Sequence, residues 1–489
     1  MAASIPICWP MKLPMMKKYK NIDLTSGSLI HAILGLAIPV VVNSFLQTMY
    51  NLTDTYWLGR LGTEELAAIN LVTPVQNVVQ NFGSGLTVAG AVLISQYIGA
   101  KKVREAREMA NQIFTCAMIF ALTCATILAL ASPAIVTWLG AEDITWQYAK
   151  TYLQLVILDM PFLYTVNMFQ SINQAQGNTV KPMLLNLVGI TINMILDPLL
   201  MIVWKWGVSG AALATVFAKM IPALIAFVLL NRKDKPVFLN LRVLKFRKDM
   251  LKSILIIGLP TAIGGSTMQL GFLLMSKSVF VYGTQAMAAY GVGNKINGLI
   301  SLPSNGIGSA VSTIVGQNVG AGNKERARKG FGISMIISVV FLLIGGFILS
   351  RMPVSTAMVR IFTDDADVIP MAADFLSIMA FWCFCNGVYN SAMGLHQGAG
   401  HTEVTMLVDV LRLWFFRFAT LYICQNVFDM GVRSVWYSVV VSNGLSALLL
   451  YLIYLTGYWK RPRGAKHETK KQKAARLIAD TECKDENQD

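Results

Sequence analysis

The sequence predicts an all-α polytopic membrane protein, with twelve transmembrane helices in two pseudo-symmetric six-helix lobes, and three observations support this fold class. Of the 489 residues, 55% are hydrophobic and only 14% are charged, whereas soluble domains average about 25% charged residues. The apolar residues gather in about twelve runs, and a helix that crosses a bilayer needs roughly 20 such residues. The second half of the chain also repeats short motifs of the first half.

The twelve apolar runs are separated by glycine, proline and charge clusters. They cover residues 29–56, 65–98, 108–138, 146–174, 180–203, 209–230, 252–280, 288–318, 329–350, 367–397, 403–426 and 434–458. The longer runs indicate helices that are tilted or kinked. The runs divide the chain into an N-terminal tail (1–24), an N-lobe (25–231), a linker (232–251), a C-lobe (252–458) and a charged C-terminal tail (459–489).

The distribution of basic residues predicts the orientation in the membrane. The net charge is +15, and Lys and Arg concentrate at 17–20, 101–107, 232–252, 324–329 and in the tail from residue 460. With twelve spans these segments all lie on one side of the bilayer, and an excess of Lys and Arg marks the cytoplasmic side. We therefore expect a multi-pass protein of the cytoplasmic (inner) membrane with both termini in the cytoplasm. No nucleic-acid-binding motif accompanies the positive charge, so the expected partner is the lipid bilayer.

The two halves are related by an internal repeat. GTEELAA begins at Gly62 and GTQAMAA at residue 283, a shift of 221 residues. The same shift maps Gln96 onto Gln317 and Gly99 onto Gly320. An even number of spans in each half makes the repeats parallel, an arrangement that is typical of transporters whose halves rock about a central site.

Two acidic residues interrupt the apolar runs of the first half. Asp54 lies near the end of the first run, and Asp197 lies in NMILDPLLM at 193–201. A charged side chain at the centre of a bilayer costs about 2.5–3.5 kcal/mol or more. The repeat places Met275 and, on a shift of 223, Thr420 at the corresponding positions of the second half. This asymmetry indicates a polar site that only one lobe has.

The stretch NMILDP combines three kinds of oxygen ligand. Asn193 and Asp197 are four residues apart, which places them on one face of a helix, and Pro198 frees the carbonyl group of Met194. Such oxygens suit a small hard cation, and a desolvated carboxylate can also take up a proton near neutral pH. The alternative is that the acids line a water-filled cleft or pair with a buried cation, for which Lys219 is a candidate.

Other charged residues also lie in apolar runs. Asp159, in VILDMPF, is expected close to the outer surface. Asp409 and Arg412 are three residues apart in the eleventh run, where they can form an internal ion pair. Arg417 can neutralise an acid or extend toward an interface. Pro39, fifteen residues before Asp54, supplies a hinge in the first span.

Several motifs, in this order, resemble those of multidrug and toxic compound extrusion (MATE) transporters. LAIPVVVNSFLQTMYNLTDTYWLGRLGTEELAAINL resembles their first span. IIGLPTAIGG, GTQAMAAYGV and VGQNVGAGNKERARKG resemble the opening of their second half, and NMILDPLLM followed by GVSGAALAT resembles their fifth and sixth spans. The resemblance covers roughly residues 25–458.

This resemblance implies two six-helix lobes around a V-shaped cleft, and export of small organic, often cationic, compounds in exchange for protons or sodium ions. In the branch that includes the DNA-damage-inducible and archaeal members, the cation site lies in the N-lobe. Pro39 matches a proline proposed to bend the first helix, and Gln47 matches a polar cavity position. The elements of the cation site, which would also be the ligands of Na⁺, appear here as Asp54, Asn193, Asp197 and Thr215.

The favoured function is therefore a monomeric secondary antiporter for multidrug efflux, without a cofactor and without enzymatic activity. A lipid-linked oligosaccharide or polysaccharide flippase of the same superfamily is the first alternative, and a channel or membrane scaffold is the second. A flippase would need a strongly cationic cleft to hold a pyrophosphate. The expected substrate cavity carries mainly amides, and its residues are Gln47, Asn51, Asn167, Gln170 and Lys219.

Overall fold

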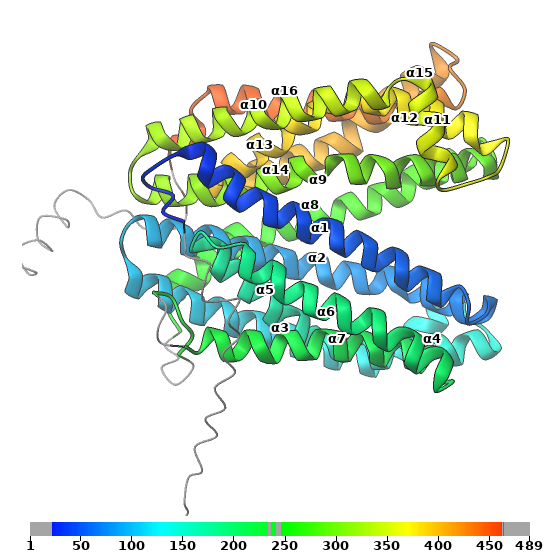
Figure 1. Ribbon diagram of the computed structural model, residues 1–489, viewed down its shortest axis with the longest axis horizontal. Helices are drawn as coiled ribbons and strands as arrows, with labels where there is room; N and C mark the ends of the chain where they lie inside the picture. Colours follow the sequence, from blue (N-terminus) through cyan, green and yellow to red (C-terminus); the bar gives the residue numbers. More distant parts are fainter. Residues whose placement is uncertain (1–21, 233–235, 241–245, 462, 464–489) are drawn as a thin grey trace, which may run out of the picture.

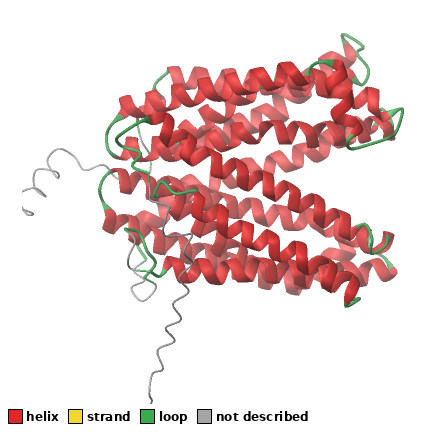
Figure 2. Ribbon diagram, in the orientation of Figure 1, coloured by secondary structure: helices red, strands yellow, loops and turns green. Residues whose placement is uncertain are grey.

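The computed structural model describes residues 22–232, 236–240, 246–461 and 463 (Figure 1). Within these residues every regular element is a helix (Figure 2). Most of the predicted terminal tails, including the basic cluster at 17–20, lies outside the described residues. The prediction of an all-helical membrane protein is confirmed.

The first half of the chain forms six long rods. Four rods are single helices, and the other two include breaks or changes of helix type. In order they are α1 (Leu29–Leu58), α2 (Thr63–Gly99), α3 (Val103–Trp138), α4 (Asp143–Val156) joined through the 3₁₀ turn η2 (Ile157–Asp159) to α5 (Met160–Ala175), α6 (Val180–Pro198) followed by the π-helical turn η3 (Leu199–Val203), and α7 (Gly207–Leu230).

The second half also forms six rods, with more interruptions. They are α8 (Lys248–Phe280), α9 (Thr284–Gly320), α10 (Lys324–Leu349), the pair α12 (Val368–Phe381) and α13 (Phe384–Gly398), the chain of α14 (Thr402–Val410), π-helical η4 (Leu411–Arg417) and α15 (Phe418–Asn426), and α16 (Arg433–Leu455). A short helix, α11 (Met352–Arg360), connects α10 to α12, and the 3₁₀ turn η5 (Tyr458–Lys460) follows α16. The two halves form separate bundles in Figure 1.

Most of the twelve rods, but not all, are long and apolar enough to be identified as membrane-spanning helices from length and composition. In the described part of the chain, nine helices are long and apolar enough to cross a membrane, and the pair α12–α13, bent by 53°, makes a tenth. The remaining rods are α9 and the interrupted α14–α15. α9 combines glycines with buried polar residues such as Ser304, Ser312 and Gln317, because it packs among other helices and not against lipid.

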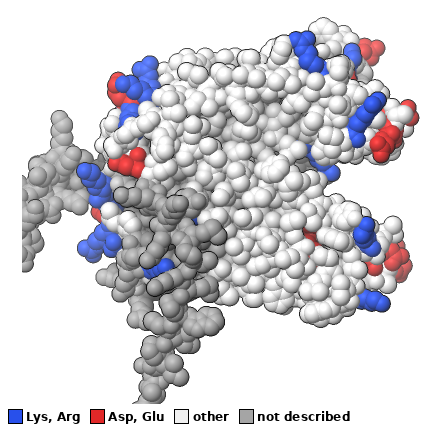
Figure 3. All heavy atoms as spheres, viewed as in Figure 1, with Lys and Arg blue, Asp and Glu red and all other residues white. Residues whose placement is uncertain are grey.

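On the face that Figure 3 shows, the outer surface between the two ends of the molecule is apolar. Lys, Arg, Asp and Glu lie at both ends, with a few in the hollow of one end, and an uncharged belt lies between them. Large apolar side chains point outward in this belt; Leu130 of α3, for example, is 79% exposed and Leu273 of α8 is 68% exposed. Contiguous exposed apolar surface of this extent indicates contact with lipid.

The first helix of each half begins against the opposite half. Near the start of α1, Leu36 packs in an apolar core with Val311 of α9, whereas Leu58 at its end packs in a core of the first half. α8 mirrors this arrangement, because Ile254 belongs to a core of the first half and Val279 to a core of the second. Each bundle therefore holds the other through one crossing helix.

Reciprocal hydrogen bonds close one end of the molecule. It is the end where the described chain begins, at residue 22, and ends, at residue 463, and it is here called the tail end. Gln96 of α2 donates from Nε2 to the carbonyl oxygen of Gly398 at 3.0 Å. Gln317 of α9, its counterpart in the repeat, donates to the carbonyl oxygen of Ala175 at 2.7 Å. The two bonds run between the halves in opposite directions. Residues that correspond in the sequence repeat therefore make corresponding contacts, related by a pseudo-two-fold axis.

Two glycines permit this close approach of α2 and α9. A Cβ atom on Gly99 would overlap the backbone carbonyl of Gln317, and a Cβ atom on Gly320 would overlap that of Gln96. At the opposite end, here called the far end, the bundles separate and the space-filling view is hollowed between them (Figure 3). The structure is therefore a V that opens at the far end.

The N-terminal segment adds a further tie between the halves at the tail end. Arg326 of α10 donates to the carbonyl oxygens of Leu24 at 3.2 Å and Ser26 at 2.6 Å. Asp23 accepts hydrogen bonds from Ser26 and Thr25, which lower the pKa of its carboxyl group to about 2. The segment before α1 is thus ordered against the second half.

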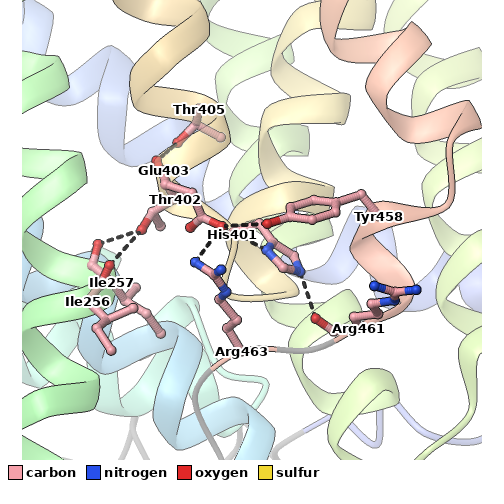
Figure 4. A network of polar contacts seen from close by, with 9 residues as sticks. All are labelled: Ile256, Ile257, His401, Thr402, Glu403, Thr405, Tyr458, Arg461 and Arg463. Atoms are coloured by element: carbon pink, nitrogen blue, oxygen red, sulfur yellow. Dashed lines mark hydrogen bonds and ion pairs between the residues drawn. The ribbon is translucent and has the colours of Figure 1, made fainter.

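The segment after α16 is fastened to the loop between α13 and α14 (Figure 4). His401 contacts Glu403 through Nδ1 at 3.0 Å and the carbonyl oxygen of Arg461 through Nε2 at 2.7 Å. Arg463 forms an ion pair with Glu403 at 2.9 Å. This network holds the loop that follows Gly398, the acceptor of the inter-lobe hydrogen bond from Gln96.

Candidate ion-coupling and substrate site

Asp197 and Asn193 lie on the buried face of α6. Each residue is only 1% exposed, in keeping with the four-residue spacing that places them on one face of the helix. Within the described residues, neither Oδ atom of Asp197 and neither amide atom of Asn193 has a hydrogen-bond partner of good geometry. Buried polar groups are nearly always satisfied, so these atoms are available to an ion or a substrate.

Asp54 of α1 completes an acidic pair with Asp197. Their carboxyl groups are close enough to interact directly. The hydroxyl groups of Tyr50 and of Tyr152, on α4, lie near both acids, and Tyr50 also interacts with Thr215 of α7. Carboxylate, amide and hydroxyl oxygens from four helices therefore gather in one region of the first half.

A third acid in the same region is already neutralised. Asp159, at the end of η2, is 4% exposed and forms an ion pair with Lys219 of α7. The 3₁₀ turn between α4 and α5 directs Asp159 inward onto Lys219. That Asp159 lies close to the outer side of the membrane stays a prediction. Lys219 thus has its own carboxylate partner, although its charge also reaches Asp54.

The charges that meet here do not balance. Three carboxylates face one ammonium group, and the ion pairs of the described residues include neither Asp54 nor Asp197. Two unneutralised carboxylates in a medium of low dielectric constant strongly favour uptake of a proton or a cation. No group of three or more His, Cys, Asp or Glu side chains in the described chain is placed to hold a metal. A bound Na⁺ would therefore rely on both acids together with oxygens of Asn193 and Thr215.

A cavity of about 210 Å³ adjoins the acidic pair. A single water needs only about 10–15 Å³ by a comparable measure, so the cavity has room for part of an organic molecule. Tyr50, Asn193 and Thr215 belong to its wall as well as to the acidic site. A hydrogen bond of 3.0 Å between Asn186 of α6 and Asn43 of α1 joins two of its sides.

Most of the residues predicted for the substrate cavity do line it. Gln47, Asn167, Gln170 and Lys219 are in its wall, together with Asn193 and Thr215 of the predicted cation site. Asn51 is not among the lining residues and is exposed. It follows Tyr50 by one position, which turns its side chain by about 100° around the helix.

Sequence reasoning missed both tyrosines of the site. Tyr50 is four residues before Asp54, so the helical spacing that linked Asn193 to Asp197 could also have identified it. Tyr152 is on a helix separated from the acids by a large distance along the chain, and no local pattern connects it with them. The pairing of Asp159 with Lys219 likewise depends on the packing of α5 against α7.

The described residues of the second half form no equivalent acidic site. Met275, the counterpart of Asp54, is fully buried in an apolar core with Trp436. Asp409 and Arg412 do not form the predicted ion pair within the described residues. Instead, Tyr389 donates a hydrogen bond to Asp409, and the guanidinium carbon of Arg412 lies 4.7 Å from the centre of the Tyr389 ring. The one-turn spacing is present, and both side chains contact Tyr389.

Comparisons with known proteins agree with this architecture. Solved structures of MATE proteins resemble it closely: one in complex with MaL6 is 24% identical, and one described as the outward-facing conformation of a multidrug resistance MATE family transporter is 23% identical. Each has a TM-score of 0.85, and each match covers 90% of this chain and 98% of that one. They establish the fold of two six-helix lobes.

Curated relatives match over nearly their whole length. A probable multidrug resistance protein NorM of Thermotoga maritima is 25% identical over 436 residues, covering 88% of this chain and 93% of the relative. The multidrug export protein MepA of Staphylococcus haemolyticus is 24% identical over 442 residues, covering 90% and 96%. The family model MatE matches residues 39–199 and 260–423, one block in each half. Because this match covers more than half of the sequence, the chain belongs to the MatE family of membrane transporters.

Proposed function

We propose that the chain is a secondary active antiporter that exports organic, cationic compounds across the cytoplasmic membrane in exchange for protons or sodium ions. Its relatives are named multidrug resistance and multidrug export proteins, which supports this substrate class. The excess of Lys and Arg in the tail-end loops supports a cytoplasmic tail end. The far end, which is open, would then face outward.

The observation that carries the proposal is the uncompensated acidic pair Asp54 and Asp197. Asp159 is neutralised by Lys219, whereas neither Asp54 nor Asp197 forms an ion pair among the described residues. A proton shared by the pair, or a sodium ion held by their oxygens, would remove the electrostatic penalty. The site therefore changes its charge when it binds the coupling ion.

The shared wall of site and cavity gives a physical basis for exchange. Tyr50, Asn193 and Thr215 serve both, so an ion that draws these side chains toward Asp197 changes the cavity that a substrate would occupy. Coupling requires a difference in affinity between two states. α1 can transmit a change at the site to the second half, because it carries Asp54 near one end and packs on the second half near the other. A second state would therefore differ in the position of α1.

The cavity does not favour a flippase for pyrophosphate-linked sugars. Lys219 is the one cation among its described lining residues, and Asp159 neutralises it. The remaining polar wall consists of amides and hydroxyls, which accommodate a cation at least as well as an anion. The acidic neighbours Asp54 and Asp197 would repel a pyrophosphate.

The test is dye efflux from proteoliposomes under an imposed proton gradient or sodium gradient. We expect Asp197→Asn and Asp54→Asn to lower gradient-driven efflux by roughly 5–150-fold, the range of a coupling free energy of 1–3 kcal/mol. Asp364→Asn, which changes an exposed acid of the far-end loop, should retain the wild-type rate. The gradient that supports wild-type efflux identifies the coupling ion. Full-rate efflux by both variants at the site would refute the assignment.

A further inference from the structure

Two clusters of buried polar atoms, one in each half, have no hydrogen-bond partner among the described residues, and the charged groups in them have opposite sign. In the first half they include the acceptor oxygens of Asp197 and Asn193. In the second half they include the donor-only atoms Arg412 Nε and Arg417 Nη1, together with the hydroxyl group of Tyr290. Acceptors bind cations, whereas charged N–H donors bind anions. The cluster around Arg412 and Arg417 therefore has the polarity of an anion site.

Arg417 is the central group of this region. It is only 1% exposed, and a guanidinium group remains charged under all ordinary conditions. Its Nε donates to Ser442 Oγ at 3.1 Å, and one terminal nitrogen donates to the side-chain oxygen of Asn443 at 3.4 Å. Its guanidinium carbon lies 5.5 Å from the ring centre of Phe272. These neutral contacts position the group but leave its charge and its Nη1 atom without a counter-ion.

The helix geometry brings a second guanidinium toward the first. Arg412 and Arg417 both lie in η4, the π-helical turn Leu411–Arg417. Hydrogen bonds in a π-helix run from residue i to i+5, so residues five apart lie roughly one turn from each other. The charge of Arg412 acts on Arg417, and this repulsion disfavours the arrangement unless an anion is present. π-helical turns occur frequently at functional sites.

Asp409 interacts electrostatically with Arg412, but one carboxylate cannot neutralise two guanidinium groups. Asp409 accepts the hydrogen bond of Tyr389, and in the part of the chain that the structure describes no carboxylate forms an ion pair with Arg412 or Arg417. Two cations and one anion leave a net positive charge. Removing a charge from water without a partner costs several kcal/mol, so an external anion is the simplest compensation.

We propose that the second lobe binds a small monovalent inorganic anion of halide size between the guanidinium groups of Arg412 and Arg417, with Tyr290 as a neutral donor. Tyr290 of α9 interacts electrostatically with Arg417, and its hydroxyl group lacks a partner in the described residues. The site is separate from the acidic pair of the first lobe and does not depend on the coupling ion.

The test compares halide with a large anion at constant sodium. Purified protein is heated in sodium gluconate, chloride or bromide at equal ionic strength, so the cation site experiences the same Na⁺ concentration throughout. A ligand that binds only the folded state raises the unfolding midpoint. We expect chloride and bromide to raise the midpoint by a few degrees relative to gluconate, and crystals grown in bromide to show an anomalous peak beside Arg417 Nη1.

Variants localise the effect. Arg417→Gln should abolish the halide-dependent rise, and Tyr290→Phe, which removes only one hydroxyl group, should raise the halide concentration needed for half of it. Arg433→Gln, which alters an exposed arginine paired with Asp374 at the far end, should keep the full halide response. Equal midpoints of the wild type in all three salts would overturn the proposal. So would bromide bound only at the surface, or an unaltered halide response in both Arg417→Gln and Tyr290→Phe.

Discussion

At the scale of single residues, the first lobe contains one neutralised acid beside two that are not. The pairing of Asp159 with Lys219 separates a structural role from a functional one. Removing one partner of a buried ion pair leaves an uncompensated charge, which costs about 3–5 kcal/mol. We therefore predict that Lys219→Met lowers the free energy of unfolding by about this amount, measured by thermal unfolding in detergent.

A double substitution shows whether Lys219→Met destabilises the protein through an unpaired charge or through lost packing. Asp159→Asn combined with Lys219→Met removes both charges, and it should recover most of the stability that Lys219→Met loses, because a neutral pair of similar size is often tolerated. A double variant no more stable than Lys219→Met would contradict the electrostatic explanation. Asp364→Asn, an exposed acid, serves as the control for loss of a carboxylate.

The acidic residues of the site were predictable from sequence, but their environment was only partly so. Asp54 and Asp197 are conspicuous because a carboxylate in an apolar run is costly, and the repeat showed that their counterparts are uncharged. Burial of Asn193 and Asp197 on one face followed from helical spacing. The position of Tyr152 and the neutralisation of Asp159 depend on contacts between helices, and periodicity along one helix contains no information about them.

At the scale of elements, α1 connects two cores. The buried residues near its start pack in a core with helices of the second half, and its last residue packs in a core of the first half. Pro39 lies between these regions and is itself buried. Because proline cannot donate a backbone hydrogen bond to the residue four positions earlier, α1 has a weakened point where its packing changes from one half to the other.

We predict that Pro39→Ala stiffens α1 and slows transport without unfolding the protein. Restoring the backbone donor should raise the cost of bending, so we expect efflux to fall several-fold while the thermal midpoint stays equal or rises. Pro133→Ala is the matched control, because α3 packs mainly within the first half and the carbonyl freed at Ala129 already accepts from Ser132 at 2.9 Å. An equal loss of efflux in both variants would argue against a specific hinge at Pro39.

Hydropathy located the elements well and their internal breaks poorly. The predicted run 65–98 corresponds to α2 at Thr63–Gly99, and 180–203 corresponds to α6 with η3. The runs 367–397 and 403–426 were predicted as single spans, but the first is bent by 53° and the second contains η4. Apolar composition reports which residues avoid water. It does not report the hydrogen-bond register, which changes in η4 without a proline or glycine in the turn.

At the scale of the whole molecule, the repeat becomes a contact between the halves. The sequence aligned Gln96 with Gln317 but did not show that each donates to the opposite half. Gln174 reinforces the same end by donating to Ser309 at 2.9 Å. A closed tail end and an open far end are the two features that alternating access must exchange.

The glycine contact between α2 and α9 gives a direct test of this exchange. Gly320→Ala adds a Cβ atom that overlaps the backbone of Gln96, and overpacking of this kind typically costs 1–3 kcal/mol. We therefore expect the tail end to open more often, with longer spin-label distances across that end and slower efflux. Gly332→Ala is the matched control, because a Cβ atom there meets nothing within 4 Å and alanine favours a helix by roughly 0.5–1 kcal/mol. If Gly320→Ala gave the same distance distribution as Gly332→Ala, the close contact between α2 and α9 would not control opening of the tail end. Closure of that end would then depend on other contacts.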